Sequence, residues 1–191
     1  TYKSAFSFLK KRVELIKNSG GKELVWILEH PLTFTSGVRS MENEILDKKI
    51  KIIKTNRGGK TTLHNPGQKI VYFALNLNKR KKDIKNLVKH IELTIIDFLK
   101  LYNIKGRADK KNIGIWVNDK KIAAIGIRVS GWVAYHGFSV NINNNLGYYK
   151  KIVPCGLSSE KITSVITESK IQILNKDNKL KDIFLRNLKN V

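Results

Sequence analysis

Apolar residues recur at helical spacing in two stretches of the chain, residues 4–17 and 83–102. Side chains three and four positions apart lie on one face of a helix, so both stretches are predicted to be amphipathic helices. The apolar face of the longer stretch consists of Ile84, Leu87, Val88, Ile91, Ile95, Phe98, Leu99 and Tyr102. Asp83 is its expected N-cap, because a carboxylate there can accept from a free N–H group of the first turn. Weaker helical patterns occur at 146–152, 159–169 and 178–189.

Short β-rich runs lie at residues 23–29, 50–55, 69–77, 113–117 and 121–129. The last two flank an Asn118-Asp119 turn and are predicted to form a hairpin, and a further pair of strands is expected within 131–143. Strand pairs dominate and helices flank them, so the predicted fold class is α+β, a single domain over residues 1–191 with a mixed, largely antiparallel central sheet. No apolar stretch approaches the roughly 20 residues that a bilayer-spanning helix needs.

The chain is strongly basic, since 37 Lys and Arg residues against 15 Asp and Glu residues give a formal net charge of +22. All but seven of the basic residues are lysine. Lysine, isoleucine and asparagine have A/T-rich codons, so genome composition alone can raise the lysine content of a tolerant surface. Whatever its origin, such a surface attracts acidic macromolecules, either nucleic acid or acidic protein, and charge alone does not choose between them.

Cysteine and histidine usage limits the chemistry. The one cysteine, Cys155, excludes an intramolecular disulfide framework and fits a reducing, cytoplasmic compartment. No nucleotide-phosphate loop, dinucleotide fingerprint or zinc motif occurs. The four histidines, which lack the spacing of metal ligands, are His30, His64, His90 and His136. We therefore expect neither a cofactor nor a metal, and interpret His90, which lies in a predicted helix, as a structural or surface residue.

Three segments depart from ordinary strands and loops, and the first is residues 57–68, RGGKTTLHNPGQ. Its paired glycines allow the backbone to approach a ligand closely, and Arg57 and His64 bracket the loop with polar groups. The alternative is that a Gly-Gly turn and a Pro-Gly turn simply join two strands.

The other two segments carry a lysine and the cysteine. In KIAAIG (121–126), small residues leave space above a sheet, and the period of two places Lys121 on the same strand face as Ala123 and Ile125. Partial desolvation there would favour a neutral lysine, and a lysine at the edge of a hairpin is the alternative. In IVPCGL (152–157), a loop between proline and glycine can expose and fix the thiol of Cys155, although a lone cysteine is often a small buried hydrophobe.

Together these segments resemble the octanoyltransferase family, the lipoyl(octanoyl) transferases that begin protein lipoylation. HPLTFTSG (30–37) resembles the family's His-Pro-x-x-Thr-x-Gly-like segment, and RGGKTTLHNPGQ resembles its Arg-Gly-Gly…His-Gly-Pro-Gly-Gln loop. Residues 121–143 and VPCGL (153–157) resemble its lysine strand, His-Gly hairpin and Pro-Cys-Gly loop. The motifs occur in the family's order over about residues 24–165.

The chain departs from the family pattern at two positions. Asn65 stands where glycine is usual, and Leu63 where an aromatic residue is usual. Asparagine tolerates the left-handed backbone that glycine would supply, so we expect the turn to survive. We expect Leu63 to alter the shape of the acyl pocket.

The resemblance implies the fold of the biotin and lipoate protein ligase catalytic domain, and transfer of an octanoyl group from octanoyl-acyl carrier protein to a lysine of a lipoyl domain. Cys155 would be the nucleophile that carries the acyl thioester, and Lys121 would favour its thiolate and exchange protons. The implied substrate-binding residues are Arg57, Gly58, Gly59, Lys60, Thr61, Thr62, Leu63, His64, Ala124, Ile125, Gly126, Gly137, Phe138 and Ser139, with His136 as a further site residue.

The resemblance also implies the partners. The acceptors would be lipoyl domains of 2-oxoacid dehydrogenases and the glycine cleavage H protein. We expect a monomer that acts without cofactor, nucleic acid or membrane.

Three alternatives stay open at this point. An ATP-dependent lipoate or biotin ligase would activate a free carboxylate, and an amidotransferase would move the acyl group between two lipoyl proteins. Cys155 favours a transferase over a ligase, because such a ligase needs no nucleophilic thiol. A basic nucleic-acid-binding protein is the third, but no RNA-recognition signature, zinc-finger spacing or basic heptad region occurs. The Lys79-Arg80-Lys81-Lys82 run is expected to be a solvated loop or to dock an acidic carrier protein.

Overall fold

The structure, a computed structural model, describes residues 1–109, 111–169, 171 and 177–191. Its main sheet contains six strands in the order β1-β5-β9-β8-β7-β6, and each neighbouring pair is antiparallel. The strands are β1 (Leu24–Leu28), β5 (Gln68–Asn76), β9 (Val133–Asn141), β8 (Lys120–Ser130), β7 (Ile115–Val117) and β6 (Arg107–Ala108). Strands β5 and β9 pair along their whole length, from Asn76 opposite Val133 to Gln68 opposite Asn141.

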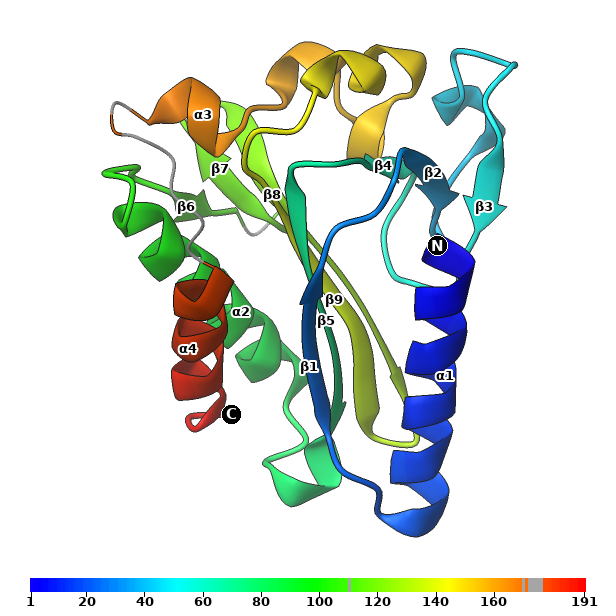
Figure 1. Cartoon of the computed structure of the whole chain (residues 1–191), viewed down its shortest axis with the longest axis vertical. Helices are drawn as coiled ribbons and strands as arrows, with labels where there is room; N and C mark the ends of the chain where they lie inside the picture. Colours follow the sequence, from blue (N-terminus) through cyan, green and yellow to red (C-terminus); the bar gives the residue numbers. More distant parts are fainter. Residues whose placement is uncertain (110, 170, 172–176) are drawn as a thin grey trace.

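A smaller sheet of three strands lies at one end of the main sheet (Figure 1). Its middle strand, β2 (Thr33–Ser36), is parallel to β3 (Ile52–Lys54) and antiparallel to β4 (Thr62–His64). The short helices at the same end are η1 (Glu42–Glu44), η3 (Leu146–Lys151), η4 (Pro154–Gly156), η5 (Ser159–Lys161) and α3 (Val165–Glu168). The end that carries the sequence motifs is therefore built mainly from loops and short elements.

Helices cover both faces of the main sheet (Figure 1). Helix α1 (Tyr2–Ser19) packs on one face, and α2 (Ile84–Lys100) and α4 (Asp177–Leu188) pack on the other. Strand β5 shows why both faces are covered. Ile70 and Tyr72 are buried with α1, whereas Val71 and Phe73 are buried with α2 and α4, because successive side chains of a strand point to opposite faces.

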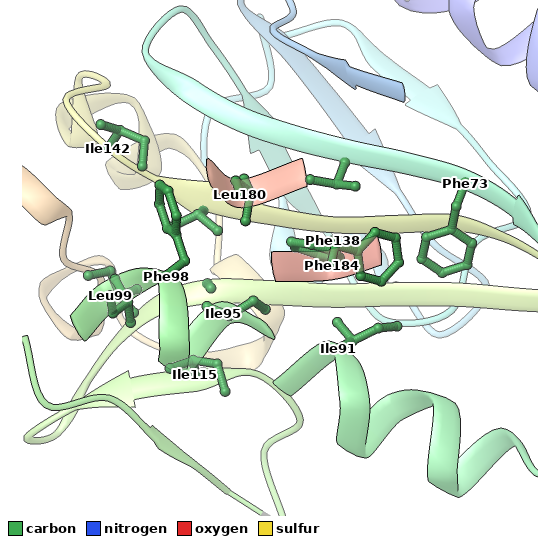
Figure 2. Close-up of a cluster of buried hydrophobic side chains, with 14 of the residues drawn as sticks. Phe73, Ile91, Ile95, Phe98, Leu99, Ile115, Phe138, Ile142, Leu180 and Phe184 are labelled. Carbon is green, nitrogen blue, oxygen red and sulfur yellow. The ribbon is translucent and has the colours of Figure 1, made fainter. Parts of the chain in front are cut away.

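The larger core lies between the sheet and the α2–α4 pair. Phe184 of α4 is fully buried, and its ring centroid lies 5.7 Å from that of Phe73 and 5.4 Å from that of Phe138. Figure 2 shows these rings beside Ile91 and Ile95 of α2. This cluster makes the central strands a rigid support for the loops at their end.

Most elements match the sequence prediction. The two amphipathic helices are confirmed as α1 and α2, and Asp83 is confirmed as N-cap of α2, accepting from the N–H of Asn86 at 2.9 Å. The predicted hairpin is confirmed as β7 and β8, and the α+β fold class with a mixed, largely antiparallel arrangement is confirmed.

Two local predictions were wrong, and three strands were not predicted. The expected strand pair within 131–143 is the single strand β9. It stays extended because it pairs along its length with β8 on one side and with β5 on the other. The expected helix at 159–169 divides into η5 and α3. Strands β2, β4 and β6 were not predicted. No helix in the described ranges is long and apolar enough to span a membrane.

Candidate active site

A cavity of about 500 Å³ lies where the small sheet meets the motif end of β8 and β9. It brings together the three segments that stood out in the sequence. The predicted site residues that line it are Arg57, Gly58, Gly59, Lys60, Thr62, His64, Lys121, Ala124, Ile125, Gly126, His136, Gly137, Phe138, Ser139 and Cys155. Segments separated by up to about 100 residues in the sequence therefore share one hollow.

Two predicted binding residues do not line the cavity. Thr61 and Leu63 alternate with Thr62 and His64 and are both fully buried on the other side. Leu63 packs in a small apolar cluster with Phe34, Tyr149 and Ile152. The expectation that Leu63 shapes an acyl pocket is therefore not supported, because the alternation of β4 directs its side chain away from the hollow.

Asn65 keeps the turn by a different route from the one expected. It is not among the non-glycine residues with a positive φ in the described chain, whereas Gly67 has φ +86°. Asn65 is almost fully buried, and its side chain donates to the carbonyl of Asn145 at 2.9 Å and accepts from Asn144 at 3.0 Å. The asparagine thus contributes hydrogen bonds instead of a left-handed backbone.

Cys155 lies at the cavity in a strained loop. Its backbone is left-handed, with φ 55° and ψ 23°, a conformation that costs a non-glycine residue about 1–3 kcal/mol. Its N–H donates to the carbonyl of Thr61 at 2.9 Å, and its thiol is free and partly exposed. Gly156 follows with φ +80°, so two consecutive left-handed residues turn the loop around the cysteine.

Lys121 reaches the cavity through an irregularity in β8. Trp116 pairs with Lys121 and Ile115 pairs with Ala123, so Ile122 is the extra residue of a β-bulge. Ile122 and Ala123 both pack in the larger core, whereas Lys121 lines the cavity. The prediction that Lys121 shares a face with Ala123 was therefore wrong, because the bulge interrupts the period of two.

The amine of Lys121 is held by the loop that precedes β7. The side chain is buried, and Nζ donates to the carbonyl of Ile113 at 2.8 Å and lies 5.8 Å from the centre of the Trp116 ring. A Cβ on Gly114 would lie 2.4 Å from Cε of Lys121 and 2.6 Å from the backbone carbonyl oxygen of Ala123, so glycine is needed here. The reading of Lys121 as a solvated hairpin-edge lysine is excluded.

Cys155 and Lys121 face one hollow, but no hydrogen bond joins them within the described part of the chain. A third group, Arg57, lies close enough to interact electrostatically with Cys155. Burial lowers the pKa of the Arg57 guanidinium and the charge of a Cys155 thiolate raises it, and the group stays cationic. Arg57 donates to the carbonyl and hydroxyl oxygens of Thr35 at 3.0 and 2.9 Å.

The small residues of β8 allow the Arg57–Gly58 loop to pack closely against this strand. The N–H of Gly58 donates to the carbonyl of Ile127 at 3.2 Å, which holds the loop against β8. A Cβ on Gly126 would lie 3.3 Å from the carbonyl oxygen of Gly58. The space expected above Gly126 is therefore occupied in part by the Arg57–Gly58 loop.

Aromatic and imidazole rings cluster at the cavity, where Tyr2, His64 and Tyr72 line it and His30 packs behind them. Tyr2 of α1 lies 4.9 Å from the ring of His30 and 5.9 Å from that of His64, and His30 Nε2 is 3.0 Å from the Tyr72 hydroxyl. Burial lowers the pKa of His30 to about 4 and that of His64 to about 3. Both imidazoles are therefore neutral near pH 7.

His136 is the second left-handed, non-glycine residue at the cavity, with φ 71° inside β9. Burial lowers its pKa to about 3, with further lowering by Arg57, and Nε2 lies 2.7 Å from Oδ1 of Asn56. The neighbouring Gly137 is obligatory, since a Cβ there would lie 1.8 Å from the carbonyl oxygen of Val71.

Sequence reasoning did not identify several residues that line the cavity: Tyr2, Arg39, Ile70, Tyr72, Val88, Lys111, Asn112, Ile113, Ile127, Gly156 and Leu157. Ile127, Gly156 and Leu157 carried a signal, because they belong to the family-like segments 121–143 and 153–157. No group of three or more His, Cys, Asp or Glu residues in the described ranges is arranged to hold a metal ion.

Known proteins share both the sequence and the fold. Residues 1–185 match the lipoyl protein ligase A/B catalytic domain family. The chain is 43% identical over 169 residues to an octanoyltransferase of Wolbachia sp. subsp. Brugia malayi (strain TRS), covering 86% of this chain and 82% of that protein. The chain belongs to the octanoyltransferase family. A second octanoyltransferase, from Bartonella bacilliformis, is 38% identical over 198 residues, covering 96% of this chain and 82% of its own.

Solved structures with the fold of this octanoyltransferase-family chain are ligases of low sequence identity. Lipoate-protein ligase A bound with ATP gives a TM-score of 0.71 at 14% identity, covering 94% of this chain and 77% of its own. Biotin protein ligase from Aquifex aeolicus gives 0.53 at 12% identity, covering 85% and 70%. These likenesses show the fold alone, and they confirm the predicted architecture.

The buried histidines predict a pH dependence of stability. Their folded pKa values lie below the roughly 6.5 of an unfolded histidine, so only the unfolded state takes up protons between about pH 6.5 and pH 4. Stability should be complete above pH 6.5 and fall as the pH drops, by up to about 1.4 kcal/mol per pH unit for each histidine.

Urea unfolding from about pH 4.5 to pH 8 measures this slope. His136→Gln should remove one histidine's share, reducing the slope below pH 6 by up to about 1.4 kcal/mol per pH unit. The free energy of unfolding at pH 8, where the histidines are neutral in both states, reports only the change in packing. An unchanged acid slope in His136→Gln would contradict a neutral, buried His136.

Proposed function

We propose that this protein transfers an octanoyl group from octanoyl-acyl carrier protein to a specific lysine of lipoyl domains, through a thioester on Cys155. The observation that carries the proposal is the partly exposed, left-handed Cys155 at a cavity that also holds Lys121 and Arg57. Membership of the octanoyltransferase family supports the acyl group and the reaction class.

In the first step the Cys155 thiolate attacks the carbonyl carbon of the donor thioester. A carbon–sulfur bond to Cys155 forms and the bond to the carrier thiol breaks. The departing thiolate takes up a proton from the Lys121 ammonium, which leaves Lys121 neutral. One thioester replaces another, so the free energy changes little and no nucleotide is needed. Arg57 and Lys121 supply positive charge to the thiolate and the developing oxyanion.

In the second step the amine of the lipoyl-domain lysine attacks the Cys155 thioester. The amide bond forms, the carbon–sulfur bond breaks, and Cys155 leaves as a thiolate. The attacking amine must lose a proton, and Lys121 in its neutral form would accept it. Because an amide is more stable than a thioester, this step runs downhill.

The cavity offers apolar surface for the acyl tail at Ile125, Ile127 and Leu157, which line it and are partly exposed. At about 0.8 kcal/mol per buried methylene, burial of an eight-carbon chain contributes roughly 5 kcal/mol. Tyr2 and His64 also line the hollow, with their ring centroids 5.9 Å apart, and an acyl chain that reached them would be limited in length.

The charge of the cavity suits acidic protein substrates. Its basic residues are Arg39, Arg57, Lys60, Lys111 and Lys121, and no described residue that lines it is acidic. Arg39 and Lys111 are exposed and form the rim of the cavity. This basic rim suits acyl carrier protein as the donor. It also suits the lipoyl domains of 2-oxoacid dehydrogenases and the glycine cleavage H protein as acceptors. We propose that the enzyme acts as a monomer in the cytoplasm.

The Lys79–Lys82 run lies at the opposite end of β5 from the cavity. Leu77 of η2 (Leu77–Lys79) donates its N–H to the carbonyl of Trp132, and Nζ of Lys82 is 5.5 Å from the centre of the Trp132 ring. This placement favours the reading of the run as a solvated loop.

Cys155→Ser tests the nucleophile. After incubation with octanoyl-acyl carrier protein and without ATP, wild-type protein should gain one octanoyl mass that maps to Cys155, whereas the serine variant should gain none. Intact and peptide mass spectrometry measure both, with thermal melting to show that the variant is folded. An adduct on another residue would refute the assignment. Adenylate formation from free octanoate and ATP would instead favour a ligase.

Charge reversal at the rim tests the partner chemistry. Arg39→Glu with Lys111→Glu should lower kcat/KM for the octanoyl carrier on the order of tenfold and weaken its salt dependence, because rim charges mainly steer association. The matched control, Lys79→Glu with Lys81→Glu, makes the same change in net charge away from the cavity. Equal losses in the two double variants, or an equal loss with a small octanoyl thioester, would contradict docking at this rim.

A further inference from the structure

One buried carboxylate lies behind the Cys155 loop and takes no part in the proposed chemistry. It belongs to Glu44, the last residue of η1, which is only 3% exposed. Nothing in the sequence motifs points to it. Its neighbour Glu42, in the same short helix, is exposed.

Glu44 contacts both loops that form the cavity. Its Oε2 accepts from the backbone N–H of Thr61 at 3.0 Å, and its own backbone carbonyl accepts from the N–H of Val153 at 2.7 Å. The carbonyl of Thr61 in turn accepts from the N–H of Cys155 at 2.9 Å. These three hydrogen bonds close a ring that runs from Glu44 through Thr61 and Cys155 to Val153 and back.

The carboxylate is ionised in this position. Burial raises the pKa of Glu44, but the hydrogen bond from Thr61 and the nearby Lys60 ammonium outweigh burial and hold the pKa below its ordinary value. Nζ of Lys60 lies 3.3 Å from Oε1 and is 3.0 Å from where a Cβ on Gly156 would stand. The ion pair therefore also lies against the residue that follows Cys155.

The ring explains how a strained cysteine stays in place. A left-handed, non-glycine residue persists only where its surroundings over-determine it. η4 is three residues long, so the loop has little structure of its own and depends on contacts with Thr61 and Glu44.

We propose that Glu44 is a positioning residue for acylation of Cys155, acting through its hydrogen bond to Thr61 and not through its charge. The inference rests on the proposed function, since Cys155 must be the acylated group. A thiol moved by about 1 Å loses much of its rate without losing substrate binding.

Two variants separate the length of the Glu44 side chain from its charge. Glu44→Gln keeps an oxygen at the distance of the Thr61 N–H and loses the charge. Glu44→Asp keeps the charge and withdraws the oxygen by one methylene. The matched control is Glu42→Asp, which makes the same change on the exposed side of η1.

Single-turnover octanoylation of Cys155 at saturating donor gives the rate constant, and its dependence on donor concentration gives the half-saturation value. Glu44→Asp should lower the rate constant on the order of 10- to 100-fold and leave half-saturation within about twofold. Glu44→Gln should stay within about threefold of wild type, and Glu42→Asp should match wild type. Glu44→Gln as slow as Glu44→Asp, or a loss confined to half-saturation, would overturn the proposal.

Alkylation of Cys155 by iodoacetamide, below the melting temperature of every variant, gives a second readout that needs no acyl donor. The alkylation rate should change in Glu44→Asp and not in Glu44→Gln. If wild type alkylates but never acquires an octanoyl group, the proposed function fails and this comparison still tests the position of the thiol. If Glu44→Asp does not fold, a slow or differently alkylated Glu44→Gln is sufficient to overturn the inference.

Discussion

The hydrogen bond from the Cys155 N–H to the Thr61 carbonyl is the contact on which the cavity depends. It joins the cysteine loop to the segment that supplies Arg57, Lys60 and His64. These two segments are far apart in the sequence. Strand β4 makes it possible, because its alternation sends Thr62 and His64 into the hollow while Thr61 stays buried behind it. A rigid main sheet, packed on both faces by helices, holds the opposite wall.

Periodicity predicted α1 and α2, since each buries a face whose spacing is visible in the sequence, and β-rich runs predicted β5 and β8. The motif order predicted which segments meet at the site. The β-bulge at Ile122 was not predictable, because it depends on the register that β7 imposes on β8. Tyr2 and Glu44 were missed for the same reason: each reaches the site by a contact between segments distant in sequence, with no local pattern to mark it.

The positions of the basic residues in the fold show which of them can take part in chemistry at the cavity. The chain has a net charge of +22, and the cavity itself combines five cations with no carboxylate on its described lining. Glu44 lies just behind that lining, where it anchors Lys60 without neutralising the hollow. Local geometry, more than net charge, therefore decides what chemistry the basic residues support: Arg57 and Lys121 are buried and fixed, whereas Lys111 and Arg39 are exposed at the rim.

The central claim is that Cys155 carries the acyl group between two protein substrates without a nucleotide. The direct measurement is to isolate octanoyl-enzyme, remove the donor, and add an apo lipoyl domain in the absence of ATP. The account predicts that one octanoyl group per enzyme moves to the acceptor lysine as the Cys155 thioester disappears. A thioester that persists while the acceptor stays unmodified, or transfer that requires ATP, would contradict it.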